Sequence, residues 1–242
     1  MSAPEEIFVL DKRVRLLQPP EGFRTSLDSV MLAAACPAQR GDRILDMGCG
    51  VGGAGLCVLT RIPDAQLTGI DIQDDHIDLA IRNASLNGME DRTEFLASDV
   101  CDYNGGKKFD HIICNPPYQE TGERTQSPSS KKETAHAHRE DITLHDWIDC
   151  AVRNLKAKGS LTVIHRADQA DKILQSLEGR FGGTEIIPLW PRENTPAKRV
   201  IIRACRDSRS PATIHPGLVL HKENGDYTDE ADDILRRALP IS

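Results

Sequence analysis

A glycine-rich segment at residues 46–53, Asp-Met-Gly-Cys-Gly-Val-Gly-Gly, constrains the fold of this chain more than any other feature. It follows the short apolar strand Asp42-Arg43-Ile44-Leu45 and precedes an apolar stretch that begins at residue 54. A strand, a glycine-rich turn and a helix start, in that order, open a nucleotide-binding βαβ unit. The spacing is neither that of the dinucleotide fingerprint nor that of a phosphate loop ending in Gly-Lys-Ser/Thr. Because such a turn also serves tight packing, it needs support from other residues.

Acidic residues stand at the ends of two later apolar runs. Asp71 closes the run 66–71, and Asp99 follows the run 93–98. A carboxylate at the first of these positions can accept hydrogen bonds from both hydroxyls of a ribose. Asp102 is close enough in the chain to take the place of Asp99. Apolar strand runs that alternate with helical patterns predict an α/β fold with a mostly parallel sheet.

The segment Asn115-Pro116-Pro117-Tyr118 directly follows the apolar run 109–114. Two consecutive prolines fix φ, donate no N–H, and push the residue before each of them to an extended conformation. The side-chain carbonyl of Asn115 and the backbone carbonyl of Pro116 can each accept one hydrogen of an –NH2 group, while Tyr118 stacks on the plane that carries this group. We therefore expect Asn115, Pro116, Pro117 and Tyr118 to form the catalytic turn of a site for a planar amine.

These motifs together resemble the motif series of class I S-adenosylmethionine-dependent methyltransferases. The residues that carry the resemblance are Asp46-x-Gly48-x-Gly50-x-Gly52, Asp71, Ser98-Asp99 and Asn115–Tyr118, in this order. Asn-Pro-Pro-Tyr marks the amino methyltransferases, which methylate a nitrogen conjugated to a ring or carbonyl. Residues 22–33 resemble the lead-in of the bacterial tRNA1(Val) adenine-N6-methyltransferase group, and the match runs roughly from Leu10 to Arg203.

The resemblance implies a Rossmann-like class I methyltransferase fold and S-adenosyl-L-methionine as the cofactor. The fold would be a seven-stranded, mostly parallel sheet with helices on both faces and an N-terminal hairpin and helix. Asp71 would bind the ribose and Asp99 the adenine amino group of the cofactor. The further residues expected at the cofactor are Arg24, Thr25, Ser26, Asp46, Gly48, Gly50, Gly52, Ile72, Ser98 and Asn115.

The implied activity is N6-methylation of an adenine in RNA, with a tRNA base next to the anticodon as the first candidate. A glutamine-N5 methyltransferase of release factors is an alternative, because a carboxamide nitrogen has the same geometry. Such enzymes carry a long helical N-terminal domain, whereas only about 40 residues precede Asp46 here. A guanine-N2 methyltransferase acting on ribosomal RNA is a second alternative. A binding module without catalysis is a third, and the intact Asn115–Tyr118 argues against it.

The net charge of −7 argues against an RNA partner at first sight. Net charge governs non-specific attraction, however, and a local basic face is enough for phosphate contact. Residues 190–210 hold six basic residues against two acidic ones, although an ordinary solvated strand pair would also explain them. The polar segment 119–139 is either a lid over the base or mobile surface. The expected RNA contacts are Lys131, Lys132, Arg139, Arg192, Lys198 and Arg199.

Seven cysteines, without a Cys-x-x-Cys or a histidine cluster at zinc spacing, predict reduced core thiols, no metal and a cytoplasmic location. The chain contains no run of 18 apolar residues, and its acidic N-terminus lacks the features of a signal peptide. We expect a hairpin and helix extension over 1–40 that packs on the cofactor site, a methyltransferase core over 41–207 and a C-terminal extension over 208–242. The oligomeric state stays open.

Overall fold

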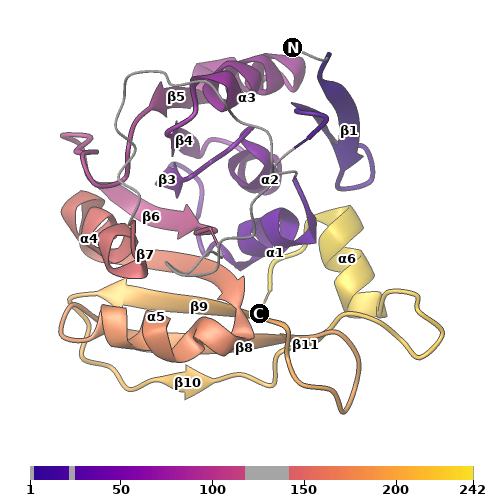
Figure 1. Cartoon of the computed structure of the whole chain (residues 1–242), viewed down its shortest axis with the longest axis vertical. Coiled ribbons are helices and arrows are strands. Elements are labelled where there is room, and N and C mark those ends of the chain that lie inside the picture. The colour runs from indigo at the N-terminus through magenta and orange to yellow at the C-terminus, as the bar shows by residue number, and fades with distance from the viewer. Residues whose placement is uncertain (1–2, 22–24, 118–141, 242) are drawn as a thin grey trace.

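The protein is described here by a computed structural model that covers residues 3–21, 25–117 and 142–241. Within these ranges a central sheet of nine strands has the order β10-β8-β9-β7-β6-β3-β4-β5, with β11 beside β8 (Figure 1). The strands are β3 (Arg43–Met47), β4 (Gln66–Asp71), β5 (Thr93–Ala97), β6 (Phe109–Cys114), β7 (Leu155–Arg166), β8 (Phe181–Trp190), β9 (Arg199–Arg206), β10 (Thr213–Ile214) and β11 (Leu218–Val219).

The sheet is mostly parallel, and its antiparallel part lies at one end. Strands β5, β4, β3, β6 and β7 are parallel to one another, whereas β9 is antiparallel to both β7 and β8. Figure 1 shows these strands in order from β5 at the top to β8 and β10 at the bottom. The expected Rossmann-like fold is confirmed. The strands beyond the expected seven are β10 and β11, which have two residues each and pair with β8.

Helices cover both faces of this sheet and divide the core into two clusters. The helices are α1 (Leu27–Ala35), α2 (Gly53–Arg61), α3 (Asp74–Leu86), α4 (Leu144–Asn154), α5 (Ala170–Leu177) and α6 (Asp229–Arg237). Side chains from α1, α2, α3 and α6 pack with Ile44 and Ile113, and those from α4 and α5 pack with Leu45 and Ile112. Because consecutive residues of a strand point to opposite faces, each central strand contributes to both clusters.

An N-terminal hairpin of β1 (Glu5–Val9) and β2 (Val14–Gln18) docks on α3 through two asparagines. Asn83 Oδ1 accepts from Leu17 N at 2.7 Å, and Asn83 Nδ2 donates to Leu17 O at 2.9 Å. Asn87 makes the same pair of bonds to Arg15, at 2.9 and 2.7 Å. Asn83 and Asn87 are four residues apart and lie on one face of α3, and Arg15 and Leu17 are two apart and lie on one edge of β2. The two side chains therefore bond the free backbone groups of β2, as the backbone of a neighbouring strand would.

Helix α1 is capped by Ser26, whose hydroxyl accepts a hydrogen bond from Asp28 N at 3.3 Å. Two arginines bind the carbonyl groups at its other end. Arg61 donates to Ala33 O and Cys36 O, and Arg203 donates to Ala35 O at 3.1 Å. Cations stabilise the carboxyl end of a helix because the last carbonyl groups lack helical partners. The helix is therefore fixed at both ends.

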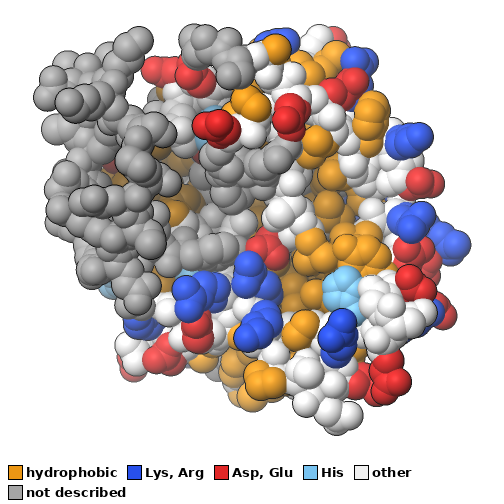
Figure 2. Space-filling model, turned by 45° about the vertical axis from the view of Figure 1, so that its right-hand side comes forward, with side chains coloured by type: hydrophobic (Ala, Val, Ile, Leu, Met, Phe, Trp, Pro, Cys, Tyr) orange, Lys and Arg blue, Asp and Glu red, His pale blue; other side chains and the backbone are white. Residues whose placement is uncertain are grey.

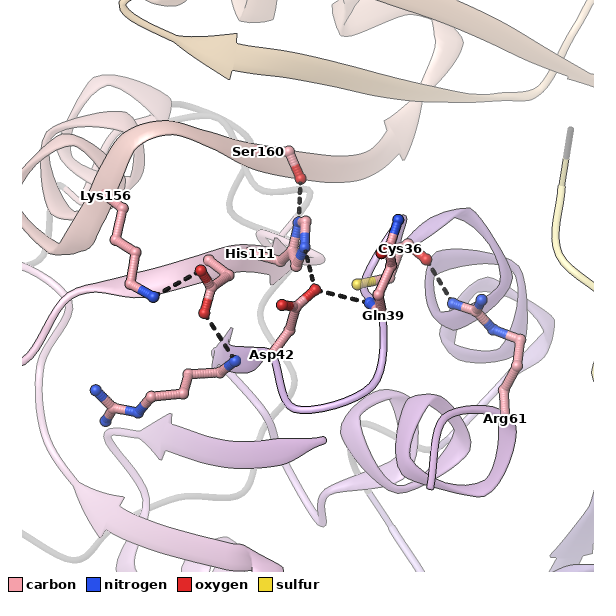
Figure 3. A network of polar contacts seen from close by, with 9 residues as sticks. Cys36, Gln39, Asp42, Arg61, His111, Lys156 and Ser160 are labelled. Carbon is pink, nitrogen blue, oxygen red and sulfur yellow. Dashed lines mark hydrogen bonds and ion pairs between the residues drawn. The ribbon is translucent and has the colours of Figure 1, made fainter. Parts of the chain in front are cut away.

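A polar network joins the amino ends of β3, β6 and β7 (Figure 3). His111 on β6 contacts Asp42 Oδ2 through Nε2 at 3.0 Å and Ser160 Oγ through Nδ1 at 2.7 Å. Asp110 accepts from Lys156 Nζ at 2.6 Å and from Arg43 N at 3.0 Å. Burial lowers the pKa of His111, although Asp42 opposes this. These contacts fasten the strands at the edge opposite the glycine-rich turn.

The C-terminal segment contains β10, β11 and α6. Thr228 caps α6 by accepting from Ala231 N at 3.2 Å, and Ile234 of α6 is buried in the core that also includes α1. Ile241 N donates to Ala34 O at 3.0 Å. The expected divisions at 40/41 and 207/208 stay predictions. No helix in the described parts of the chain combines the length and apolar character needed to cross a membrane.

Candidate active site

The candidate residues come together at the carboxyl edge of the sheet. Strand β3 lies between β4 and β6, so the strand order reverses at this point. Met47 at the end of β3 pairs with Ile70 of β4 and with Cys114 of β6. Parallel α/β sheets bind ligands in the crevice outside such a reversal. The glycine-rich turn, Asp71 and Asn115 therefore leave three adjacent strands at the same level.

The glycine-rich turn needs glycine for both its conformation and its packing. Gly48, Gly50 and Gly52 have φ values of 66°, 53° and 83°, in the left-handed region that favours glycine. A Cβ built on Gly48 would lie 2.6 Å from Cη2 of Trp147, a buried side chain of α4. Trp147 is a contact that sequence reasoning missed, because nothing local in the sequence links α4 to this turn.

Asp71 is held in place by the backbone on both sides. Its Oδ2 accepts from Gly50 N at 2.9 Å, and its Oδ1 accepts from Gln73 N at 3.0 Å. Burial raises the pKa of Asp71, but His76 and these two N–H groups lower it more, so the net pKa lies below its usual value. Each carboxylate oxygen has a second acceptor direction, which suits the two hydroxyls of a ribose.

His76 is a second residue that sequence reasoning missed. It lies in the first turn of α3, is buried, and places Nδ1 3.7 Å from Asp71 Oδ1. This separation is that of a close ion pair and too long for a hydrogen bond.

Asp46 is a buried carboxyl group at the end of β3. Its Oδ2 accepts from Gly55 N at 3.1 Å, in the first turn of α2. Burial raises the pKa of Asp46 to about 7, with the Gly55 hydrogen bond opposing this rise and the charge of Asp71 adding to it. The group therefore changes protonation near neutral pH. A cation bound beside it favours the carboxylate form.

Ile72 and Asp99 border the part of the edge beyond Asp71. Ile72 is 40% exposed, which leaves an apolar surface at the residue next to Asp71 in the chain. Asp99 Oδ1 accepts from Cys101 N at 2.8 Å, and Ser98 N donates to Asp71 O at 2.8 Å. An apolar surface flanked by carboxylates fits a purine ring with an amino group. Asp99 is thereby fixed by its own turn.

The N-terminal elements contact the glycine-rich turn directly. Asn83 Nδ2, besides its bonds to β2, donates to Val51 O at 3.0 Å, and its side chain is fully buried. A Cβ on Gly53 would lie 2.7 Å from Thr25 Oγ1, so Thr25 packs against the end of the turn. Ser26 serves as the N-cap of α1. Arg24 lies outside the described residues.

The segment Asn115–Tyr118, here called the acceptor turn, directly follows Cys114 at the end of β6. Cys114 pairs with Met47 on one side and Val163 on the other. Asn115 is half-buried, Pro116 is buried and Pro117 is exposed. Neither proline carries an N–H group, so the backbone offers carbonyl acceptors here and no donors at these two positions. Tyr118 lies outside the described residues.

The basic residues expected at RNA differ in their surroundings. Arg192 and Lys198 are exposed on the hairpin that joins β8 to β9. Arg199 is half-buried and forms an ion pair with Asp28 of α1 at 2.9 Å, which gives it a role within the fold. Lys131, Lys132 and Arg139 lie outside the described residues.

The described residues contain no group of three or more His, Cys, Asp or Glu side chains that could hold a metal ion. All seven cysteines are free thiols, and five of them are buried: Cys36, Cys49, Cys57, Cys114 and Cys150. Burial raises the pKa of Cys57 to about 12, which keeps this thiol protonated and unreactive. The cysteines of the core thus act as packing residues.

Comparison with known families identifies the class of this chain. Residues 24–188, more than half of the chain, match the family model of the methyltransferase small domain. The chain belongs to the methyltransferase small domain family. The expected methyltransferase activity is confirmed at the level of the family, and S-adenosyl-L-methionine is the methyl donor. The roles of the individual residues at the carboxyl edge stay predictions.

Several known proteins are similar to the chain along most of its length. The tRNA1(Val) (adenine(37)-N6)-methyltransferase of Vibrio parahaemolyticus is 28% identical over 210 residues, which cover 86% of this chain and 85% of that protein. A protein of the same name from a Flavobacteriaceae bacterium is 32% identical over 153 residues, covering 63% and 64%. A crystal structure from Agrobacterium tumefaciens, of a predicted O-methyltransferase named Atu636, has a TM-score of 0.72 at 28% identity, covering 86% of this chain and 94% of that one.

The residues of the carboxyl edge fit S-adenosyl-L-methionine. The ionised Asp71, the exposed Ile72 and the fixed Asp99 offer partners for a ribose, an adenine ring and an exocyclic amine. The left-handed glycines allow close approach of the backbone to the methionine part, and Asp46 lies buried behind them. This methyltransferase site thus has one group of suitable chemistry for each part of the cofactor.

Proposed function

We propose that this methyltransferase methylates N6 of an adenine in tRNA, at the base next to the anticodon. The observation that carries the proposal is the Asn115-Pro116-Pro117 turn, which leaves β6 at the level where the glycine-rich turn leaves β3. The tRNA1(Val) (adenine(37)-N6)-methyltransferases of two Vibrio species, similar over most of the chain, support the choice of substrate.

The acceptor turn solves a chemical problem of the amine. The lone pair of an aromatic amine is delocalised into the ring, so this nitrogen is a poor nucleophile. Asn115 Oδ1 and the Pro116 carbonyl each accept a hydrogen bond from one hydrogen of this amine. These bonds localise the lone pair on the nitrogen and direct it toward the methyl group of the cofactor. These carbonyl dipoles also stabilise the positive charge that develops on the nitrogen. The product nitrogen loses its proton readily, so no general base is required before the attack.

Orientation supplies the other part of the rate increase. When bound, S-adenosyl-L-methionine supplies an electrophilic methyl group at the carboxyl end of β3. Asp71 and the glycine-rich turn hold the donor on one side, and Asn115 holds the acceptor on the other. Fixing two reactants in one geometry converts a bimolecular step into an effectively unimolecular one. Tyr118 is proposed to stack on the adenine ring once this base leaves its neighbours.

RNA is the partner that this proposal requires, and a cytoplasmic location accompanies it. The bases of an anticodon loop are partly unstacked, which lowers the cost of placing one of them in the site. The proposed RNA contacts are the basic residues of the β8–β9 hairpin, Arg192, Lys198 and Arg199, together with Lys131, Lys132 and Arg139.

Methyl transfer from labelled cofactor to unmodified tRNA tests the proposal, with release factor and ribosomal RNA as competing acceptors. We expect label in tRNA alone, and N6-methyladenosine as the labelled nucleoside after digestion and mass spectrometry. Label on a glutamine of release factor, or on guanine, would contradict the proposed acceptor while leaving the methyltransferase chemistry intact.

A further inference from the structure

The carboxyl edge of the sheet carries opposite charges on its two halves. The half formed by β3, β4 and β5 is acidic, with exposed or half-exposed carboxylates at Asp74, Asp75, Asp99 and Asp102. The half formed by β7, β9 and β8 carries Arg166, Arg192, Lys198 and Arg199 against Asp168 and Glu193. Figure 2 shows a group of Lys and Arg side chains on the lower part of one face. A polyanion is therefore repelled from the cofactor half and attracted to the other half.

The basic residues stand in sequence across the sheet, starting beside the acceptor turn. Because Cys114 pairs with Val163, Arg166 lies on the neighbouring strand close to the level of Pro117. Arg166 pairs with Arg199 of β9, and Arg199 pairs with Leu189 of β8. Neighbouring strands are about 4.8 Å apart, so Arg166, Lys198 and Arg192 lie about 5, 10 and 14 Å from the acceptor turn across the sheet.

Two of these cations have no ion-pair partner among the residues that the structure describes. Arg166 pairs with Asp168 and Arg199 pairs with Asp28, so part of their charge is compensated. Arg192 and Lys198 are exposed, and no such partner is found for either side chain within the described ranges. Exposed and uncompensated cations are the side chains best able to release counterions from a phosphate backbone.

The hairpin that carries these two cations is held in a fixed shape. Thr195 Oγ1 donates to Arg192 O at 2.7 Å, and Lys198 N donates to Leu189 O at 3.2 Å. The C-terminal segment supports it from the other side, where His221 N donates to Pro191 O at 3.1 Å. Little ordering is needed on binding, which reduces the entropic cost of recognition.

An acidic region limits how far a polyanion can continue beyond the hairpin. Past His221, Asp226, Asp229, Asp232 and Asp233 line a hollow of about 540 Å³ on α6. Lys222, Arg236 and Arg237 compensate part of this charge through ion pairs. Phosphate groups gain no attraction there, so the favourable path ends at the β8–β9 hairpin.

We infer that Arg166, Lys198 and Arg192, here called the basic strip, bind the phosphate backbone of the RNA strand next to the adenine that Asn115 receives. The inference rests on the proposed function. The RNA strand leaves the acceptor turn over β7, crosses β9 and ends at the β8–β9 hairpin. The strip positions the strand without reading its sequence, because phosphate contacts carry no base information.

The test reverses the two uncompensated charges in the double variant Arg192→Glu/Lys198→Glu. Binding of fluorescently labelled unmodified tRNA is measured by anisotropy over a series of salt concentrations, and methylation kinetics are measured in parallel. We expect tRNA binding to be at least about tenfold weaker at moderate salt. The plot of log K against log salt should also be less steep by about 1.4, since each phosphate contact to a single strand contributes about 0.7 to the slope. KM for tRNA rises, whereas kcat at saturating tRNA and the affinity for the cofactor do not change.

The matched control is Lys12→Glu/Lys107→Glu. Both lysines are exposed, one in the β1–β2 turn and one before the amino end of β6, and the change in net charge is the same. This control retains tRNA binding and the full salt slope. Equal weakening by both double variants, or unchanged binding in Arg192→Glu/Lys198→Glu, would overturn the basic strip. A wild-type protein that binds tRNA through the strip yet methylates another acceptor would contradict the proposed function and leave the strip standing.

Discussion

Asn83 joins the N-terminal hairpin to the glycine-rich turn through its hydrogen bond to Val51 O, at 3.0 Å. The same side chain bonds both backbone groups of Leu17 and is fully buried. Asn87, one turn later, binds the hairpin in the same manner and shows no bond to the turn among the described contacts. Both asparagines therefore hold the hairpin on α3, but only Asn83 also bonds the glycine-rich turn among the described contacts. Variants of the two residues can separate docking of the hairpin from support of the cofactor site.

Replacing Asn83 by alanine should weaken both folding and cofactor binding. The change leaves buried backbone groups of Leu17 and Val51 without partners, which costs about 1–3 kcal/mol of unfolding free energy. We also expect roughly tenfold weaker cofactor binding by calorimetry, because Val51 is released. Asn87→Ala is the control and should lose about 1 kcal/mol with unchanged cofactor affinity. Equal loss of affinity in the two variants would mean that docking of the hairpin alone supports the site.

The sequence was informative wherever function depends on the ends of parallel strands. The glycine-rich turn, Asp71, Asp99 and Asn115 each follow an apolar run, and parallel strands place such ends at one edge of the sheet. The long-range contacts could not be found in this manner, since Trp147 and Gly48, which lie together in the fold, are 99 positions apart in the chain.

The partner of Asn83 and the helix α6 are only weakly indicated by the sequence around them. Asn83 follows Ala80 on the buried face of α3, and a polar residue on an apolar face calls for a partner. Helix α6 has buried side chains only at Ala231 and Ile234, and its charged residues hide the helical period. Its cap at Thr228 was the clearest available sign of a helix start.

Gly48 is predicted to tolerate alanine less well than a glycine with the same backbone angle. Gly48 and Gly88 have φ of 66° and 63°, but a Cβ on Gly88 would meet no atom within 4 Å, whereas one on Gly48 would meet Trp147. Gly88→Ala should therefore cost only the left-handed strain, about 1–2 kcal/mol. Gly48→Ala should lower the free energy of unfolding by more than this, as measured by denaturant unfolding, and it should also weaken cofactor binding. An equal loss of stability in the two variants would show that Trp147 moves aside for the added methyl group without a loss of stability.

Cofactor affinity should depend on pH through Asp46. Its pKa in the folded protein is about 7, above the ordinary value of 3.8, so lowering the pH from 7.5 to 5.5 protonates the group. With the Asp46 carboxylate paired with the ammonium group of the cofactor, the dissociation constant of the cofactor rises by up to about tenfold for each pH unit below this pKa. Asp46→Asn should bind more weakly and lose this part of the dependence. Identical pH profiles in calorimetry would exclude Asp46 from ammonium binding.

Asp71 is predicted to contribute mainly to cofactor affinity. Asp71→Ala removes the acceptor proposed for the ribose hydroxyls, and hydrogen bonds to a charged group contribute about 1.5–3 kcal/mol, which corresponds to a loss of roughly tenfold or more in affinity. Asp75→Ala changes the same charge at an exposed position of the next helix and should leave affinity unchanged. Calorimetry that finds wild-type affinity in Asp71→Ala would remove Asp71 from the cofactor site.

The most direct test of the acceptor turn is methyl transfer by Asn115→Ala, measured together with its affinity for S-adenosyl-L-methionine. Loss of one preorganised partner of the developing charge costs about 10²–10³ in rate, so we predict a fall of at least about a hundredfold in kcat toward tRNA. Cofactor affinity should stay near the wild-type value. An equal loss of transfer and of cofactor affinity, or transfer at the wild-type rate, would contradict the role of Asn115 as the partner of the adenine amine.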